Sequence, residues 1–239
     1  MRDDDILLTP QGITGHKSDI FWQRFFPGCA PQEIYQILKR GMPPWEPYEK
    51  IVLYVDAAGF LTIQIDLFQQ RIQHSDFCFK IGEGEAKLIA GYVFINQQKA
   101  SATQMLVNME DIYEMKEIST VRVASEEIGS YAWLKYGFVP DTVESFRPGV
   151  IKNLDQYEHF IPKEEREFVT RLLQSCSDDP KIAWAIADMD GMTNEPKPRK
   201  YGQLLMIDTN WTGSRDRYDA DSMARFHSYC KGKLAEREI

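Results

Sequence analysis

The alternation of hydrophobic and polar positions is clearest between residues 88 and 138, where it predicts a strand, a helix, a strand and a helix in succession. Residues 88–95 are an apolar run, rich in β-branched and aromatic side chains and too short for a packed helix. Such a run is typical of a strand buried on both faces. A second β-rich run at 119–124 follows a helical segment, so we expect the two strands to be parallel.

The two helices of this segment have recognisable ends. Ser101 and Gln104 have the spacing of a capping box, which predicts that the first helix begins near Ser101. Its apolar stripe consists of Met105, Met109 and Ile112, with Leu106 and Tyr113 beside it. We expect the stripe to end at Lys116, with the lysine stem reaching out to water. The second helix is predicted over 127–136, with Gly137 as its left-handed cap.

The residues that precede this segment have the pattern of an antiparallel meander. Apolar or alternating runs at 51–56, 60–68 and 72–81 predict three strands, with a glycine-containing link at 57–59 and a further hairpin loop, Gly82-Glu83-Gly84-Glu85, after the third strand. An amphipathic helix at 31–40 can dock on the resulting sheet through Ile34, Ile37 and Leu38. The predicted fold class is therefore α/β, with a mixed sheet and helices on both faces.

Beyond residue 138 the pattern becomes less regular. We expect a strand at 139–146, followed by a helical insertion over 149–187 and a polar, solvated loop at 188–200. An apolar run at 203–208 is predicted to be one more strand, and a last helix is predicted over 221–235.

Two short motifs lie at the ends of the predicted helices. Gln97-Gln98-Lys99-Ala100-Ser101-Ala102 joins the first strand to the first helix, and Trp133-Leu134-Lys135-Tyr136-Gly137-Phe138 ends the second. In this order and spacing they resemble motifs of the GNAT N-acyltransferases. That family has a Gln/Arg-x-x-Gly-x-Gly/Ala turn, which holds the pyrophosphate of acyl-coenzyme A, and a Tyr-x-x-x-Gly-Phe helix end. The chain departs from the family at Ala100, where glycine is usual, and at Trp133, where tyrosine often supplies the general acid.

The resemblance implies a single GNAT-like domain over residues 1–239, with a core of about 51–146 plus 203–208. It implies transfer of an acyl group, most simply acetyl, from coenzyme A to an amine by direct attack in a ternary complex. Acetyl-CoA is then the co-substrate, and the acceptor is a small-molecule or protein amine. The implied cofactor-binding residues are Phe94, Ile95, Gln97, Gln98, Lys99, Ala100, Ser101, Ala102 and Thr103. The catalytic candidates are Tyr136 and Tyr131, which could protonate the leaving thiolate, and Glu127, near which the amine would arrive.

Two alternatives remain open at this stage. A helix N-terminus offers free N–H donors and partial positive charge, so the turn before residue 101 could hold a phosphate, with Lys99 adding a full charge. The same residues also suit an ordinary strand-to-helix turn with a good cap, and both tyrosines suit packing roles. The alternative function is a catalytically inactive GNAT-like protein that serves as a binding or interaction scaffold.

The composition excludes several other classes. A formal net charge of −8 opposes binding to nucleic acid, since the basic run 197–200 is short, and it favours a cationic amine as acceptor. No apolar segment is long enough for a membrane span, and the N-terminus is acidic where a signal peptide would be basic, so we expect a cytoplasmic protein. The four cysteines lack a Cys-x-x-Cys pair, which disfavours a zinc site or a disulfide framework.

Two further polar groups have simpler explanations than a site. His74 and Asp76 share one face of a predicted strand and could form an acid–base pair, although an exposed polar face is the commoner arrangement. Asp188, Asp190 and Asn194 suggest calcium ligands, but no glutamate completes a twelve-residue calcium loop. We therefore predict no metal site.

Overall fold

The computed structural model describes nine ranges of the chain: residues 6–9, 11–15, 18–42, 50–69, 72–93, 101–125, 129–175, 178–194 and 197–236. Within them, the side chains of residues 66–69, 72–77, 88–93 and 101 are not described. The chain divides into two compact units, the first formed by residues 1–121 with 230–239 and the second by residues 122–229. The single domain over 1–239 stays a prediction, and each unit is described by itself.

The first unit contains an antiparallel sheet. Its strands are β1 Ile6–Thr9, β2 Gly12–Thr14, β3 Lys50–Val55, β4 Leu61–Gln69, β5 Ile72–Ile81 and β6 Glu85–Val93. They lie in the order β2-β1-β3-β4-β5-β6, and each neighbouring pair is antiparallel. The predicted meander is therefore confirmed, whereas the short β1–β2 hairpin was not predicted. The parallel pairing of 88–95 with 119–124 stays a prediction.

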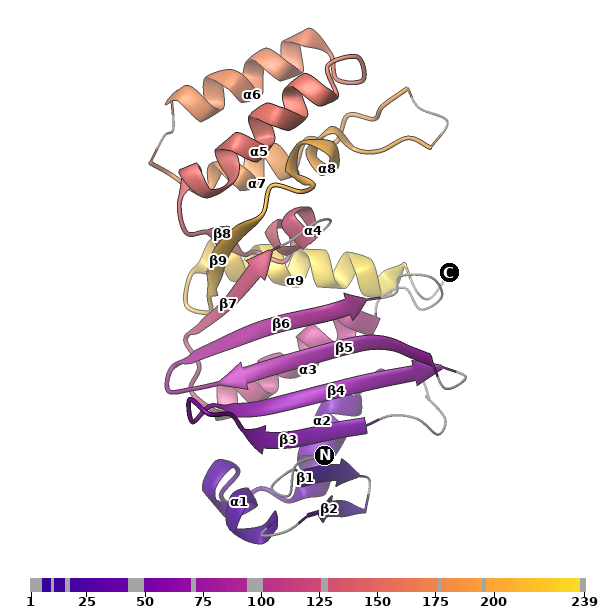
Figure 1. Cartoon of the computed structure of the whole chain (residues 1–239), viewed down its shortest axis with the longest axis vertical. Helices are drawn as coiled ribbons and strands as arrows, with labels where there is room; N and C mark the ends of the chain where they lie inside the picture. The colour runs from indigo at the N-terminus through magenta and orange to yellow at the C-terminus, as the bar shows by residue number, and fades with distance from the viewer. Residues whose placement is uncertain are drawn as a thin grey trace. The chain divides into compact units, whose positions relative to one another are not determined.

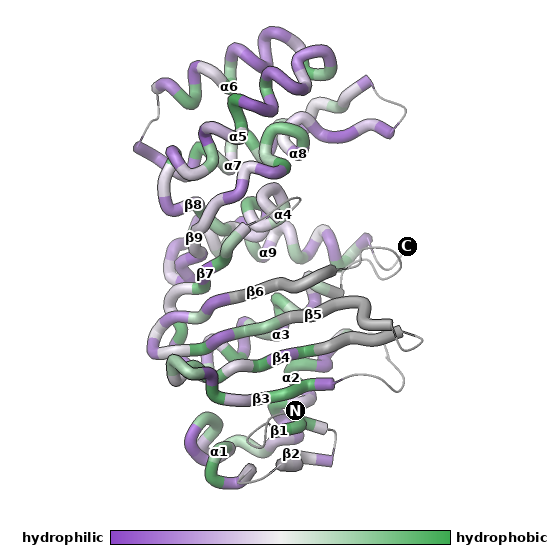
Figure 2. The backbone as a smooth tube through the Cα atoms, viewed as in Figure 1, coloured by the Kyte–Doolittle hydropathy of each residue, from purple (hydrophilic) through white to green (hydrophobic). Residues whose placement is uncertain are grey.

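Helices cover one face of this sheet. Figure 1 shows α2 Pro31–Lys39 and α3 Ser101–Met115 against the same face, and the remaining helix of the unit before β3 is α1 Ser18–Phe25. The predicted stripe of α3 is confirmed, since Met105, Met109 and Ile112 are all buried. In Figure 2 much of β3 is green, in keeping with the buried Ile51 and Leu53. Burial of these apolar side chains is the main favourable term in forming such a core.

Two polar residues in and just after α3 make contacts that were not predicted. The amide of Gln104 donates to Asn108 Oδ1 at 2.9 Å, while the capping box with Ser101, whose side chain is outside the described set, stays a prediction. The Lys116 ammonium does not reach out to water: it donates to the carbonyl of Phe25 and lies 5.3 Å from the centre of the Phe26 ring. Burial lowers the pKa of Lys116. The Lys116 ammonium, which the sequence pattern assigned to solvent, is therefore half-buried beside Phe25 and Phe26.

The buried side chain of Asn108 connects α3 to α2 by hydrogen bonds. Its Nδ2 donates to the carbonyls of Leu38 and Arg40, at 3.0 and 2.9 Å, and its side chain is fully buried. The last carbonyls of a helix have no partner within the helix, so a neighbouring donor must satisfy them. Asn108 does this for α2.

The second unit alternates short strands with helices. Its elements are α4 Gly129–Lys135, β8 Val139–Pro140, α5 Val143–Gln156, α6 Lys163–Ser175, α7 Ile182–Ala187, α8 Tyr201–Met206 and β9 Trp211–Asp216. The boundaries between the two units fall within strand β7 Thr120–Ser125 and within helix α9 Ala220–Ala235. β8 pairs antiparallel with β9. The described chain as a whole is thus α/β, as predicted.

Two predicted strands are helical in the structure. The strand expected at 139–146 ends at Pro140, because Thr142 caps α5 by accepting a hydrogen bond from the Ser145 N–H at 3.3 Å. The strand expected at 203–208 is helix α8, which Figure 2 shows as largely green beside the mostly purple α6. A short, fully buried apolar run has no periodicity that separates strand from helix. The actual strand, β9, follows at residues 211–216, for which the sequence predicted no element.

Helix α8 is held by close packing and by a second buried asparagine. A side chain at Gly202 would collide with the carbonyls of Ile186 and Ala187, so only glycine permits this approach of α8 to α7. Asn153 of α5 donates to the carbonyls of Leu205 and Ile207, at 3.1 and 2.7 Å. Asn153 thereby does for α8 what Asn108 does for α2.

Residues 149–187, expected to be helical, contain the end of α5 and all of α6 and α7, and the last helix predicted over 221–235 is confirmed as α9. On α6 the buried residues are Val169 and Leu173, whereas Phe168 is exposed. No helix in the described ranges is both long enough and apolar enough to pass through a bilayer.

Candidate functional site

Most of the predicted cofactor-binding residues lie outside the described ranges. These are Phe94, Ile95, Gln97, Gln98, Lys99 and Ala100, and the catalytic candidate Glu127 is also outside them. What is described is the frame on either side: β6 ends at Val93, and α3 begins at Ser101. Ala102 is half-buried and Thr103 is buried in the first turn of α3. The beginning of α3 is therefore packed into the first unit.

The predicted cap of α4 is confirmed in detail. Gly137 has a φ of 82°, and its N–H donates to the Leu134 carbonyl at 3.1 Å. The Phe138 N–H donates to the Trp133 carbonyl, also at 3.1 Å. This pair of bonds is a Schellman motif, which needs a left-handed residue at Gly137. A side chain there would also collide with the backbone of Ser222 at the start of α9.

Tyr136 lies among aromatic rings. Its side chain is 8% exposed, and its ring centre is 5.9 Å from that of Trp133 and 4.8 Å from that of Tyr229. Phe226 is a further neighbour, at 6.4 Å. Trp133, which stands at the position of the family tyrosine, belongs to the same group of rings. This environment suits packing, which is one of the two roles expected for Tyr136.

Tyr131 has a different environment on the same helix. It is half-buried, and its electrostatic neighbours are Lys200, Asp190, Asp188 and Arg225. Burial raises the pKa of the Tyr131 phenol, against the lowering effect of the Lys200 ammonium. The hydroxyl therefore keeps its proton at neutral pH and can act as a hydrogen-bond donor or an acid.

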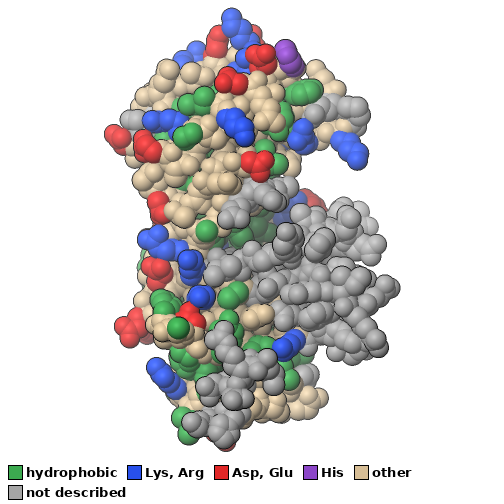
Figure 3. Space-filling view, in the orientation of Figure 1, with side chains coloured by type: hydrophobic (Ala, Val, Ile, Leu, Met, Phe, Trp, Pro, Cys, Tyr) green, Lys and Arg blue, Asp and Glu red, His purple; other side chains and the backbone are tan. Residues whose placement is uncertain are grey.

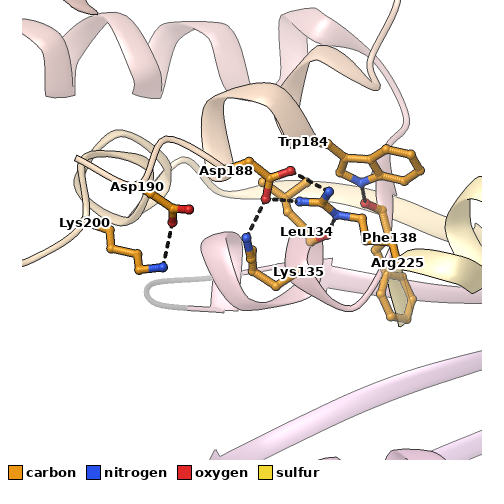
Figure 4. A network of polar contacts seen from close by, with 8 residues as sticks. All are labelled: Leu134, Lys135, Phe138, Trp184, Asp188, Asp190, Lys200 and Arg225. Carbon is orange, nitrogen blue, oxygen red and sulfur yellow. Dashed lines mark hydrogen bonds and ion pairs between the residues drawn. The ribbon is translucent and has the colours of Figure 1, made fainter. Parts of the chain in front are cut away.

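The charged residues beside Tyr131 are brought together from α4, the loop after α7, and α9 (Figure 4). Asp188 accepts two parallel hydrogen bonds from Arg225, at 2.6 and 2.7 Å, and a third from Lys135 at 2.5 Å. Arg225 Nε donates in addition to the Leu134 carbonyl at 2.8 Å. We call Lys135, Asp188 and Arg225 the Asp188 cluster. Bidentate arginine–carboxylate pairs are among the stronger charge-assisted hydrogen bonds.

A second ion pair and a tryptophan flank this cluster. Lys200 donates to Asp190 at 2.6 Å, and the Arg225 guanidinium lies 5.2 Å from the Trp184 ring centre. Trp184 Nε1 donates to the Phe138 carbonyl at 2.7 Å (Figure 4). These contacts connect the end of α4 to α7, α9 and the loop 188–200.

The electrostatics of the cluster favour ionised side chains. Burial opposes the ionisation of Asp188, but hydrogen bonds from Arg225 and Lys135 outweigh it, so the pKa of Asp188 is lowered. The hydrogen bond between Asp190 and Lys200 lowers the pKa of the former and raises that of the latter. The cluster can therefore hold the end of α4 and position Tyr131.

The sequence did not identify the Asp188 cluster. Asp188 and Asp190 were assigned to a solvated loop, whereas the structure pairs both carboxylates with cations. Nothing in the local pattern connects Arg225 of α9 to residues almost 40 positions earlier, since such a pair forms only in the tertiary fold. Among described residues, no group of three or more His, Cys, Asp or Glu side chains could hold a metal ion. The side chains of His74 and Asp76 lie outside the described set.

Comparison with known proteins adds no assignment: no family model matches the chain, and no curated protein matches it.

Proposed function

We propose that the protein is an acyl-coenzyme A-dependent N-acyltransferase with a GNAT-like core. The observation that carries the proposal is the succession β6, α3, β7 and α4, closed by the Schellman motif at Gly137. This is the order in which the two GNAT-like motifs occur in the sequence. Helix α3 begins at Ser101, within the first motif and at the residue near which the sequence predicts its start.

The proposed cofactor site is the turn 97–102 and the first turn of α3. The first four N–H groups of a helix have no partner within it, and they carry partial positive charge. A pyrophosphate above this end of α3 would be bound by backbone donors, without a conserved side chain. Because Met105 and Met109 anchor the helix in the core, these donors would need little rearrangement on binding.

The proposed proton donor to the leaving thiolate is Tyr131. Of the two tyrosines that the sequence indicates, Tyr131 lies beside Lys200 and Arg225, and Tyr136 is packed among rings. Burial and the Asp190 and Asp188 carboxylates raise the pKa of Tyr131, so the phenol keeps its proton until it donates, and the Lys200 ammonium and Arg225 guanidinium partly offset this rise. The acidic net charge of the chain favours a cationic amine as acceptor, and on the face in Figure 3 the basic side chains are interspersed with acidic ones.

The test is calorimetric titration of the whole protein with acetyl-CoA, using Ser101→Pro and Ala220→Pro as variants. Ser101 is the first residue of α3, where proline is tolerated, so Ser101→Pro removes one N–H donor but keeps the helix. We expect wild-type binding, and loss of binding in Ser101→Pro. Ala220→Pro, at the exposed first residue of α9, controls for a general effect of proline at a helix start. Unchanged affinity in a folded Ser101→Pro variant would place the phosphate site elsewhere.

The second candidate function is that of a catalytically inactive scaffold with the same core. The packing of Trp133 and Tyr136 among aromatic rings favours it, because neither side chain is left available for proton transfer. The scaffold requires no acyl transfer to any amine. Absence of transfer across a panel of amines, together with absence of acetyl-CoA binding, would support it over the enzyme.

A further inference from the structure

We infer that a groove between α5 and α6 is a binding site for a small anionic amphiphile, a molecule with a carboxylate head and an aliphatic tail. The groove has a volume of about 460 Å³ and lies within the second unit. That volume is within the range of small-molecule sites, roughly 300–1,000 Å³. The inference does not depend on acyltransferase activity.

The walls of the groove are suited to an aliphatic tail. Ile151, Leu154 and Leu173 line it, and Ile151 is 48% exposed although it is a large apolar side chain. Covering such a side chain with an alkyl chain removes apolar surface from water from both partners. The neighbouring Thr170 and Gln174 are exposed and can hydrogen-bond at the edge.

Two arginines supply the complement to an anionic head. Arg147 of α5 and Arg166 of α6 both line the groove, against a single lining carboxylate, Asp155. Their ion pairs with Glu144 and Glu158 are long, at 3.4 and 3.8 Å, and both glutamates are at least half exposed. A surface pair of this kind contributes little, so it competes weakly with a ligand.

The guanidinium groups of Arg147 and Arg166 have more N–H donors than their backbone contacts use. Arg147 Nη2 donates to the Leu173 carbonyl at 3.2 Å, and Arg166 Nε donates to the Ile161 carbonyl at 3.2 Å. Each guanidinium has five N–H donors, and these backbone contacts fix its position without neutralising its charge. Two positioned guanidinium groups beside apolar walls match a carboxylate that carries an alkyl chain.

The probe is decanoate, titrated into the whole protein below its micellar concentration and followed by calorimetry, with decanol and acetate as the tail-only and head-only comparisons. We expect decanoate to bind more tightly than either. Arg166→Gln should weaken decanoate binding roughly tenfold, the effect of losing one charge-assisted contact. Arg171→Gln makes the same charge change on an exposed part of α6 outside the groove and should leave binding unchanged.

A second variant tests the location. Thr170 is exposed, so Thr170→Phe can fill the groove without disturbing the core, and it should abolish decanoate binding while thermal unfolding stays near wild type. Equal binding of decanoate and decanol, equal effects of Arg166→Gln and Arg171→Gln, or absence of decanoate binding would each overturn the inference. Tighter binding of an acidic peptide without an aliphatic tail, retained in Thr170→Phe, would assign the arginines to a protein partner instead and would also overturn it.

Discussion

Replacing Asn153 by leucine should loosen helix α8 specifically. Leucine has a similar size but cannot donate, so the carbonyls of Leu205 and Ile207 lose their hydrogen-bond partner. An orphaned buried polar group costs about 1–3 kcal/mol, and two such groups, one of them only partly buried, cost about 2–4 kcal/mol together. The loss should appear where the bonds were, at the end of α8.

Hydrogen exchange measured by mass spectrometry suits this prediction, because it reports on α8 separately from the rest of the chain. If the helix opens locally, a loss of about 2–4 kcal/mol accelerates exchange of its amides by roughly 30- to 1,000-fold. Lys152→Ala is the control, since Lys152 is the exposed neighbour on α5 and its loss should change little. Exchange in α8 that is equally fast in Asn153→Leu and in wild type would refute the reasoning.

Three other changes test the second unit. Asp188→Asn should lower the melting temperature at neutral pH. Because the folded pKa of Asp188 is held below the ordinary value of an aspartate, its stabilising effect is present above that ordinary value and lost as the pH falls through the folded pKa, so melting curves of variant and wild type should converge in acid. Gly137→Ala should destabilise the unit by more than about 2 kcal/mol in urea unfolding, because it combines a positive φ with a collision against α9, whereas Gly232→Ala, in open space, should not. In an acyl-transfer assay, Tyr131→Phe should lower turnover by roughly 100-fold or more, as expected for loss of a general acid, and Tyr136→Phe should not; the opposite order would exchange their roles.

The elements that the sequence predicted well are those with an unambiguous period. Met105, Met109 and Ile112 mark α3 because its inner face repeats every three or four residues, and the meander over β3, β4 and β5 consists of β-rich runs with short links. Residues 203–208 were assigned wrongly because a fully buried run shows no period. The strand at 139–146 was wrong because the Thr142 cap was overlooked.

The polar interactions of the fold were less predictable than its apolar core. Asn108 is not part of the predicted apolar stripe of α3, yet it is buried and caps another helix. The ion pair between Asp188 and Arg225 requires the packing of α4, α7 and α9, because the two residues are far apart in the sequence. A local pattern records which residues avoid water, but it does not record which distant donor will satisfy a given acceptor. The candidate site could therefore be outlined from α4, whereas its charged surroundings could not.

The first unit is discontinuous in the chain, since residues 230–239 join residues 1–121 only after residues 122–229 have been made. Ribosomes add about 5–20 residues per second, so Cys230, which belongs to the buried core, emerges roughly 5–20 s after β7. During that interval the first unit is incomplete, and the last residue of the second unit, Tyr229, is made immediately before Cys230. N-terminal parts of a chain usually fold first during synthesis, but here the last step is the completion of the N-terminal unit by residues 230–239. A chaperone that shields exposed apolar surface would therefore act longest on the N-terminal half.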